Sequence, residues 1–159
     1  MTKVRIITVG KLKESYLLQA QAEYLKRLRP YLNVEIEEVN DLPCPEGASA
    51  AQEEQVREKE GMLIRNLIRP REYVVTLDRQ GKELSSVELA KFMDERSMAG
   101  DTVVFVIGGS LGLTEEFIKG AQFSLSFSKL TFPHQLFRVM LLEQVYRAMK
   151  INRGEKYHK

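Results

Sequence analysis

The sequence contains few of the residues from which disulfides and metal clusters are built. Of its 159 residues, one is cysteine, Cys44, and two are histidine, His134 and His158. A single cysteine excludes an internal disulfide and a cysteine-based zinc cluster, and two histidines are too few for a convincing metal site. We therefore expect a protein that works without a bound metal.

Long apolar runs are also missing. The N-terminal segment offers only Ile6, Ile7 and Val9, which is too short for a secretory signal. No other run approaches the roughly 20 apolar residues that span a bilayer. Apolar residues make up 43% of the chain and charged residues 29%, which is ordinary for a globular protein. We expect one cytoplasmic domain, spanning residues 1–159, with no membrane partner.

Two nucleotide-binding fingerprints are absent, although a glycine loop is present. Gly108, Gly109 and Gly112 match neither the G-x-G-x-x-G spacing nor the phosphate-binding G-x-x-x-x-G-K-[ST] pattern. Paired glycines let the backbone approach a ligand closely. A tight turn between a strand and a helix explains them about equally well, so both interpretations stay open.

The spacing of apolar residues predicts an α/β protein. Strands are predicted at residues 3–9, 33–39, 72–77 and 102–107, and helices at 14–29, 50–68, 85–99 and from Pro133 onward. Residues 102–107 show no alternation, which is typical of a strand covered on both faces in a parallel sheet. Ligands of open α/β sheets bind at the carboxyl ends of the strands. The loops that follow Leu77 and Ile107 are therefore the predicted pocket walls.

The last predicted helix combines positive charge with two apolar sides. Residues 133–159 carry six Lys or Arg and two acids, although the whole chain has a net charge of only +2. This excess fits nucleic acid, or a solvated helix end whose cations complement the helix dipole. Eleven of the sixteen residues 136–151 are apolar, and Glu143, Arg147 and Lys150 form one narrow polar stripe. The core of a small domain can cover one apolar side of this helix. The other apolar side therefore predicts a partner, most economically a second copy of the chain.

Three features of the C-terminal region have a structural and a functional interpretation. Arg138 lies opposite the polar stripe, where it is either a paired structural arginine or a ligand for phosphate or carboxylate. His134 either caps the helix or belongs to the site. Tyr157, His158 and Lys159 are either a frayed terminus or a group suited to stacking on a base beside phosphate.

Several short motifs are spread through the chain from Leu77 onward. They are Leu77-Asp78-x-x-Gly81-Lys82, Ile107-Gly-Gly-x-x-Gly-Leu113, Thr131-x-Pro133-His134-Gln135-Leu136-x-Arg138, Glu143-Gln144-x-Tyr146-Arg147-Ala148 and the terminal Tyr157-His158-Lys159. Together these motifs resemble those of the ribosomal RNA large subunit methyltransferase H family, a branch of the SPOUT methyltransferases. The resemblance covers the whole chain and is dense from Thr76 onward.

This resemblance implies a fold and a cofactor site. It implies a SPOUT-type parallel sheet with a C-terminal trefoil knot, the knot and the S-adenosylmethionine site lying in about residues 72–159. Composition and periodicity give no sign of a knot, which is a rare topology. The implied cofactor contacts are Thr76, Leu77, Gly108, Gly109, Phe127, Ser128, Lys129, Leu130, Thr131 and Phe132.

The resemblance also implies a reaction: methylation of N3 of a pseudouridine in helix 69 of 23S rRNA by a homodimer that acts on assembled ribosomes. The dimer would form through the C-terminal helix, and the tail of one protomer would complete the site of the other. The catalytic candidates are His134, Arg138, Glu143 and His158, and the RNA-binding candidates are Arg147, Tyr157, His158 and Lys159. Two alternatives remain: a non-catalytic ribosome-binding factor, and a SPOUT enzyme that acts on another RNA such as tRNA.

Overall fold

Five parallel strands form the centre of the protein. In the computed structural model, which describes residues 2–159, the strands are β1 (Lys3–Val9), β2 (Asn33–Val39), β3 (Tyr73–Glu83), β4 (Val103–Ile107) and β5 (Phe123–Ser126). Their order across the sheet is β2-β1-β4-β3-β5, and every neighbouring pair is parallel. Every residue of β4 is buried, as expected for an apolar strand in the middle of a parallel sheet.

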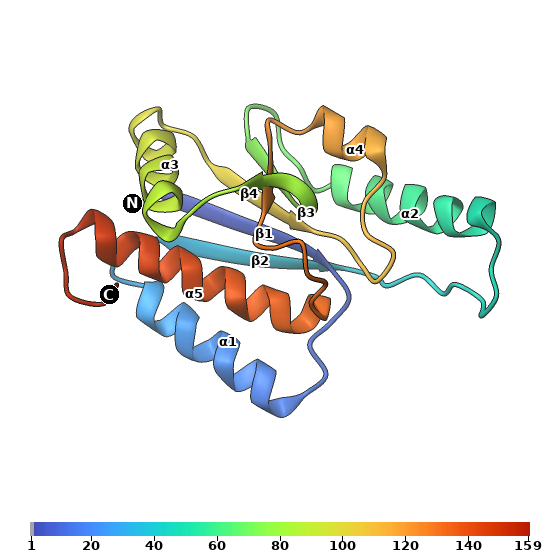
Figure 1. Cartoon of the computed structure of the whole chain (residues 1–159), viewed down its shortest axis with the longest axis horizontal. Helices are drawn as coiled ribbons and strands as arrows, with labels where there is room; N and C mark the ends of the chain where they lie inside the picture. The colour runs from blue at the N-terminus through green and yellow to red at the C-terminus, as the bar shows by residue number, and fades with distance from the viewer. Residues whose placement is uncertain (1) are drawn as a thin grey trace.

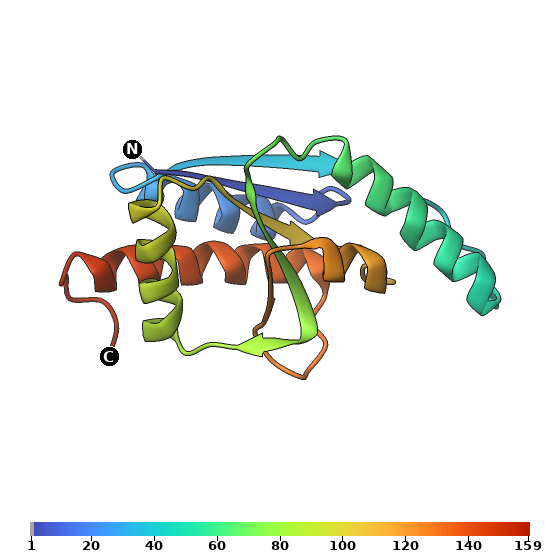
Figure 2. The ribbon, with the colours of Figure 1, turned by 90° about the horizontal axis from the view of Figure 1, so that it is seen from above.

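Helices cover both faces of this sheet (Figures 1 and 2). The elements α1 (Ser15–Leu28), α3 (Ser86–Met98) and α5 (His134–Asn152) share one core with the sheet. The elements α2 (Ala50–Arg65) and α4 (Glu115–Gly120) share a second core on the opposite face. Alternate residues of β1 and β4 supply the two cores, because successive side chains of a strand point to opposite faces.

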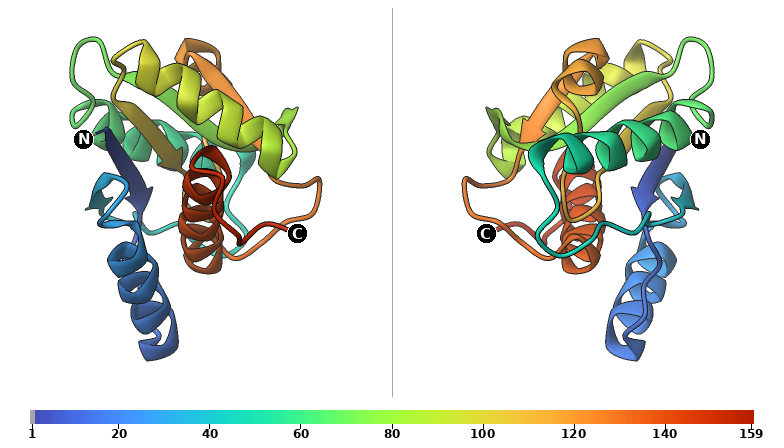
Figure 3. Two further views of the ribbon diagram at one scale, coloured as in Figure 1. Left: turned by 90° about the vertical axis from the view of Figure 1, so that its left-hand side faces the viewer. Right: turned by 90° about the vertical axis from the view of Figure 1, so that its right-hand side faces the viewer.

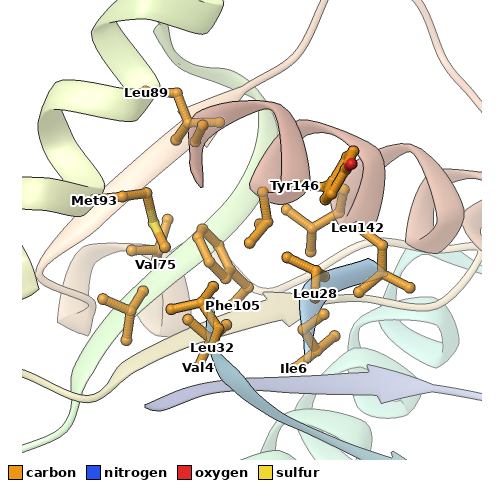
Figure 4. Close-up of a cluster of buried hydrophobic side chains, with 14 of the residues drawn as sticks. Val4, Ile6, Leu28, Leu32, Val75, Leu89, Met93, Phe105, Leu142 and Tyr146 are labelled. Carbon is orange, nitrogen blue, oxygen red and sulfur yellow. The ribbon is translucent and has the colours of Figure 1, made fainter. Parts of the chain in front are cut away.

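The larger core is centred between α5 and the strands. Phe105 of β4 is fully buried there, with Leu142 and Tyr146 of α5 on one side and Val4 and Ile6 of β1 on the other (Figure 4). Fully burying one such side chain contributes about 1.5–3 kcal/mol relative to leaving it exposed. The position of α5 is therefore fixed against the middle of the sheet.

The predicted helices and strands are largely confirmed, with two differences at β3 and β5. The third strand was expected to end at residue 77, yet β3 resumes pairing with β5 at Lys82 after an irregular stretch. The serine-rich segment contains a strand, β5, that was not predicted. Four residues at the edge of a sheet, two of them serines, give little apolar signal.

The surroundings of α5 change the interpretation of its two apolar sides. Helices α1 and α3 flank it on the face of the sheet (Figures 1 and 3), and contacts with both are extensive. The protein's own helices therefore cover much of the surface that predicted a partner. Leu136, at the N-terminal end of α5, remains 40% exposed, and Leu130 in the preceding segment is 69% exposed.

Candidate functional site

A cavity of roughly 650 Å³ lies where β4 ends and beside the irregular stretch of β3 that follows Leu77. Its walls come from three parts of the chain that are far apart in sequence, residues 77–79, 107–113 and 127–137. This is the edge at which ligands of parallel sheets bind, and the volume suits a ligand the size of a nucleoside with a side group. The structure thus brings the two predicted wall loops and the serine-rich segment together.

The glycine loop after β4 turns back on itself. The amide of Gly112 donates a hydrogen bond to the carbonyl oxygen of Gly109 (3.0 Å), and Gly112 has a φ of +79°. A Cβ added to Gly108 would lie 2.9 Å from the carbonyl carbon of Gly112. Since real Cβ atoms do not approach a backbone so closely, the turn requires glycine at 108, and at 112 glycine avoids left-handed strain. The tight-turn interpretation of these glycines is therefore confirmed. The loop also lines the cavity, and the ligand interpretation stays a prediction.

The opposite wall is held by contacts of β3 with β5 and with the segment that follows β5. A Cβ on Gly81 would lie 2.7 Å from the carbonyl carbon and oxygen of Ser124, so the two strands are in close contact there. Beyond this contact, Arg79 Nη1 donates a hydrogen bond to Thr131 Oγ1 (2.8 Å). Arg79 and Thr131 both line the cavity, and their bond links two of its walls.

Aromatic side chains form the floor near the start of α5. The ring of Phe137 lies 4.8 Å from that of Phe127 and 6.3 Å from that of Phe132. His134, one turn before Phe137, is the first residue of α5 and also lines the cavity. The rings, tilted against one another by 44° and 31°, offer an apolar aromatic surface, and the histidine adds a polar group beside it.

Most of the residues predicted to bind a cofactor line this cavity. Eight of the ten do so: Leu77, Gly108, Gly109, Phe127, Ser128, Leu130, Thr131 and Phe132. Thr76 is completely buried in β3 and Lys129 is exposed outside the cavity. Asp78, Arg79, Ser110 and Leu111 lie in the two predicted wall loops and also line the cavity, although none was predicted as a cofactor contact. Sequence reasoning missed Pro133 and Phe137 as lining residues. Pro133 is the immediate chain neighbour of a predicted residue, and Phe137 follows His134 by one helical turn, so helical spacing was the available signal for Phe137.

The structure supports the structural interpretation of Arg138. The side chain is 1% exposed and lies outside the lining of the cavity. Its Nη1 donates to Glu38 Oε2 (2.7 Å) and Gln21 Oε1 (3.3 Å), and its Nη2 donates to the carbonyl oxygen of Gly10 (3.0 Å). The guanidinium thus ties α5 to α1 and to the ends of β1 and β2. The prediction that it contacts phosphate or substrate is not supported by this arrangement, because both terminal nitrogens bond to the protein itself; the buried Nε has no hydrogen-bond partner among residues 2–159.

The other charged candidates gather on α5 around Glu143. Its carboxylate accepts hydrogen bonds from Arg147 Nη2 (2.6 Å), Arg147 Nε (3.1 Å) and the Tyr157 hydroxyl (3.1 Å). These bonds to Glu143 raise the pKa of Arg147, while burial, followed by the same carboxylate, raises the pKa of Tyr157. The nearest atoms of Arg147 and His158, Nη1 and Nδ1, lie 3.2 Å apart. Lys159 is exposed beyond them.

The tail cluster, made up of Glu143, Arg147, Tyr157 and His158, lies at a different point along α5 from the cavity. At 1.5 Å per residue, Glu143 is about 13 Å and Arg147 about 20 Å along the axis from His134. Of the four catalytic candidates, only His134 lines the cavity. A second hollow of roughly 420 Å³, lined by Glu143, Met140 and Leu84 among others, shares Phe127 and Phe132 with the cavity. One chain therefore does not bring its own tail to its own cavity.

A family model described as "Predicted SPOUT methyltransferase" matches residues 2–158. The chain belongs to the SPOUT methyltransferase family. The expected SPOUT membership is thereby confirmed, together with the α/β fold and its five parallel strands. The trefoil knot stays a prediction.

Curated SPOUT relatives are similar over their whole length. The protein "Ribosomal RNA large subunit methyltransferase H" of Symbiobacterium thermophilum is 55% identical over 160 residues, with 99% of each chain covered. The protein of the same name from Desulfitobacterium hafniense is 49% identical over 160 residues, with 100% of each covered. That of Clostridium acetobutylicum is 52% identical over 157 residues, covering 98% of this chain and 99% of the relative.

A solved structure shares the SPOUT fold at low sequence identity. It is "a probable methylase family protein from Haemophilus influenzae Rd KW20", with a TM-score of 0.56 and 13% identity. The match covers 98% of this chain and 70% of the other. At this identity the likeness supports the fold alone.

Two further properties of this SPOUT chain concern metals and membranes. Across residues 2–159, no group of three or more His, Cys, Asp or Glu side chains is placed to hold a metal ion. Within the same residues, no helix is long and apolar enough to cross a membrane.

Proposed function

We propose that this chain is an S-adenosylmethionine-dependent methyltransferase that modifies N3 of a pseudouridine in helix 69 of 23S rRNA on assembled ribosomes. The observation that carries the proposal is the cavity at the end of β4 and the irregular stretch of β3, built by a chain about half identical to ribosomal RNA methyltransferases along its full length. A ribosomal substrate places the enzyme in the cytoplasm.

The cavity fits S-adenosylmethionine. Its volume of roughly 650 Å³ lies within the range of about 300–1,000 Å³ that is usual for small-molecule sites. Phe127, Phe132 and Leu77 supply apolar walls for an adenine ring, and the tight glycine turn leaves backbone groups free of covering side chains. When bound, the cofactor supplies a methyl group on a sulfonium, which is a good leaving group.

The protein's own part in the reaction is to position the groups and to help a proton leave. His134 stands at the start of α5 on the cavity wall, next to Gly10, whose added Cβ would lie 3.6 Å from His134 Nε2. In this position His134 is the candidate that accepts the N3 proton or orients the base. Holding the two reacting groups in line supplies most of the remaining acceleration.

The tail cluster is assigned to RNA. Arg147 presents a guanidinium next to the aromatic ring of Tyr157, whose centroid is 4.7 Å from the guanidinium carbon. A cation next to an aromatic ring, with His158 and Lys159 beyond, suits a stacked base and its phosphate. Glu143 holds this arrangement together through its bonds to Arg147 and Tyr157.

A site that needs both the cavity and the tail requires a homodimer. The two lie at different points along α5, and an isologous pair of antiparallel helices would bring the tail of one protomer to the cavity of the other. The exposed side chains of Leu130 and Leu136 beside the cavity give such an interface apolar surface.

Mixing two inactive variants tests this trans arrangement. One variant carries Gly108→Val, which disrupts the cavity, and the other is truncated after Lys156, which removes the tail. If the tail acts in trans, a randomly mixed population regains roughly a quarter of the wild-type rate, because half of its dimers are mixed and each holds one intact site. If the tail acts in its own chain, the mixture stays inactive. Circular dichroism and sedimentation would confirm that both variants fold and associate.

The function itself is tested with methyl-labelled S-adenosylmethionine. The purified protein is offered ribosomes that carry the unmethylated pseudouridine, the matching free 23S rRNA, and bulk tRNA. Lys91→Ala, on the exposed side of α3, is the control for a substitution away from the cavity and the tail and should behave like the wild-type protein. Label in the 23S rRNA of ribosomes alone supports the proposal. Label in tRNA changes the substrate, and an absence of both label and cofactor binding favours a non-catalytic ribosome-binding factor.

A further inference from the structure

A buried carboxyl group lies behind the glycine loop and has no part in the chemistry described so far. Glu60, on α2, is 3% exposed, and its Oε2 accepts a hydrogen bond from the amide of Leu42 (3.1 Å). Acidic side chains are rarely buried to this extent unless they serve a specific contact. Besides Leu42, Glu60 lies beside Gly109 in the loop that forms one wall of the cavity.

Gly109 is enclosed between Glu60 and β1. A Cβ built on Gly109 would lie 3.2 Å from Glu60 Oε1 and 3.1 Å from Val9 Cγ1. Both neighbours are fixed, Val9 by its place in the core and Glu60 by its bond to Leu42. The backbone at Gly109 therefore has little room to move toward α2 or toward the sheet.

A smaller cavity shows where the loop would move if this support were lost. It has a volume of roughly 280 Å³, is lined by Asp41, Leu42, Cys44 and Glu60 among others, and shares Ser110 and Leu111 with the larger cavity. These two residues thus separate the two spaces. One turn before Glu60 on the same helix, Arg57 Nη1 donates a hydrogen bond to the carbonyl oxygen of Leu111 (3.4 Å).

We propose that Glu60 is a positioning residue for cofactor binding, which holds the loop of residues 108–113 against the larger cavity by bracing Gly109. The inference rests on the proposed function in that the ligand is S-adenosylmethionine. It assigns Glu60 no contact with the cofactor, since the side chain does not line that cavity.

The protonated carboxyl group fits this support best. Burial is the main cause that raises the pKa of Glu60. The hydrogen bond from the Leu42 amide opposes this effect, and the neighbouring Asp41 raises the pKa further. A protonated Glu60 keeps the Leu42 contact and has a hydrogen to share with Asp41. Ionisation would place two like charges together beneath the loop. Cofactor affinity should therefore fall as the pH rises through the raised pKa of Glu60.

Four variants measured with S-adenosylhomocysteine, a stable cofactor product, test the inference. By titration calorimetry, Glu60→Ala should weaken binding at least about tenfold, because it removes a buried hydrogen-bonding group from under the loop. Glu60→Asp withdraws the carboxyl group by one methylene and should give an intermediate loss. Glu60→Gln, the isostere of the protonated acid, should bind within about threefold of wild type. Glu58→Ala, exposed on the same helix, is the matched control and should bind like wild type.

The pH profile separates this role from a merely structural one. The cofactor affinity of the wild-type protein should fall with rising pH relative to that of Glu60→Gln. This variant keeps the other ionisable groups around the loop, Asp41, Cys44, Arg57 and His134, and lacks only the Glu60 carboxyl group. In turnover, Glu60→Ala should raise KM for the cofactor far more than it lowers kcat. Glu60→Ala affinity within about twofold of wild type, or parallel pH profiles for wild type and Glu60→Gln, would overturn the inference.

Hydrogen exchange keeps the two proposals distinguishable. Amides of residues 108–113 should exchange faster in Glu60→Ala than in Glu58→Ala without any ligand, because the loop loses its support. If the wild-type protein binds no cofactor, the proposed function fails, and unchanged exchange in the same residues would refute the bracing role by itself.

Discussion

The ion pair between Arg138 and Glu38 makes an asymmetric prediction. The two partners are 1% and 33% exposed at their side chains, so water reaches one of them and not the other. Replacing Glu38 by alanine leaves a guanidinium in the core without its carboxylate, which should cost about 3–5 kcal/mol of unfolding free energy. Replacing Arg138 by methionine leaves a carboxylate that can hydrate and a buried Gly10 carbonyl without its donor, which should cost about 1–3 kcal/mol.

The measurement is urea unfolding of both single variants and the double variant. Each change should lower the midpoint without changing the slope, since the surface exposed on unfolding stays the same. The double variant should be more stable than the sum of the single losses predicts, because the buried charge and its partner leave together. The exposed pair Arg27–Glu23 is the control, and its disruption should leave the midpoint unchanged.

Either of two results would refute this account of Arg138. A greater loss of stability in Arg138→Met than in Glu38→Ala would show that the burial of the guanidinium is not the controlling feature. An unchanged midpoint together with loss of methyl transfer at saturating cofactor would return Arg138 to the catalytic role first considered for it. The structure predicts the opposite: reduced stability, with kcat of the folded fraction largely retained.

Three further predictions concern the loop contacts, the tail and pH. Gly81→Ala should destabilise the protein by about 1–3 kcal/mol in urea unfolding and weaken cofactor binding, because the added Cβ would clash with the Ser124 backbone 2.7 Å away. An unchanged midpoint of urea unfolding would contradict the close packing of β3 on β5. In a spectrophotometric titration of the tyrosines, Tyr157→Phe should remove a component that ionises above the ordinary pH range of tyrosine, because burial and the Glu143 carboxylate raise the pKa of Tyr157. If the lost component ionises in the ordinary range, the described surroundings of Tyr157 are contradicted. The contribution of Glu60 to stability is complete below the pKa of an unfolded glutamate and is lost as the pH rises through the raised pKa of Glu60 in the folded protein. The melting temperature of Glu60→Gln minus that of the wild-type protein should therefore increase over this pH window. A difference that stays constant with pH would contradict the raised pKa.

The sequence predicted the parts of the fold that depend on local apolar pattern. The strands at residues 3–9 and 33–39 have the predicted bounds, because β-branched and alternating segments leave a clear signal. The glycine loop and the stretch after Leu77 could be identified as cavity walls, since each was predicted to follow the carboxyl end of a strand, although the second is an irregular part of β3. Eight of the ten residues that the resemblance implied as cofactor contacts line this cavity.

The remaining features depend on contacts between distant parts of the chain. The partner of Arg138 is Glu38, 100 positions away, and no local pattern links the two. Glu60 lies within a run of charged residues on α2, where nothing distinguishes it from its exposed neighbours until the loop of residue 109 packs on it. The edge strand β5 is too short and too polar to be recognised, and its pairing with β3 completes the cavity.

The length of α5 has a consequence for how this protein can change. Because one continuous helix joins His134 to Arg147, inserting a single residue between them would turn the tail cluster by about 100° and shift it by about 1.5 Å. The apolar side chains that hold α5 on the sheet would turn with it. Insertions or deletions in this helix are therefore compatible with the fold only near whole numbers of turns, such as about seven residues for two turns. The spacing between the cavity and the tail cluster is thus adjustable in steps of several ångströms and not continuously.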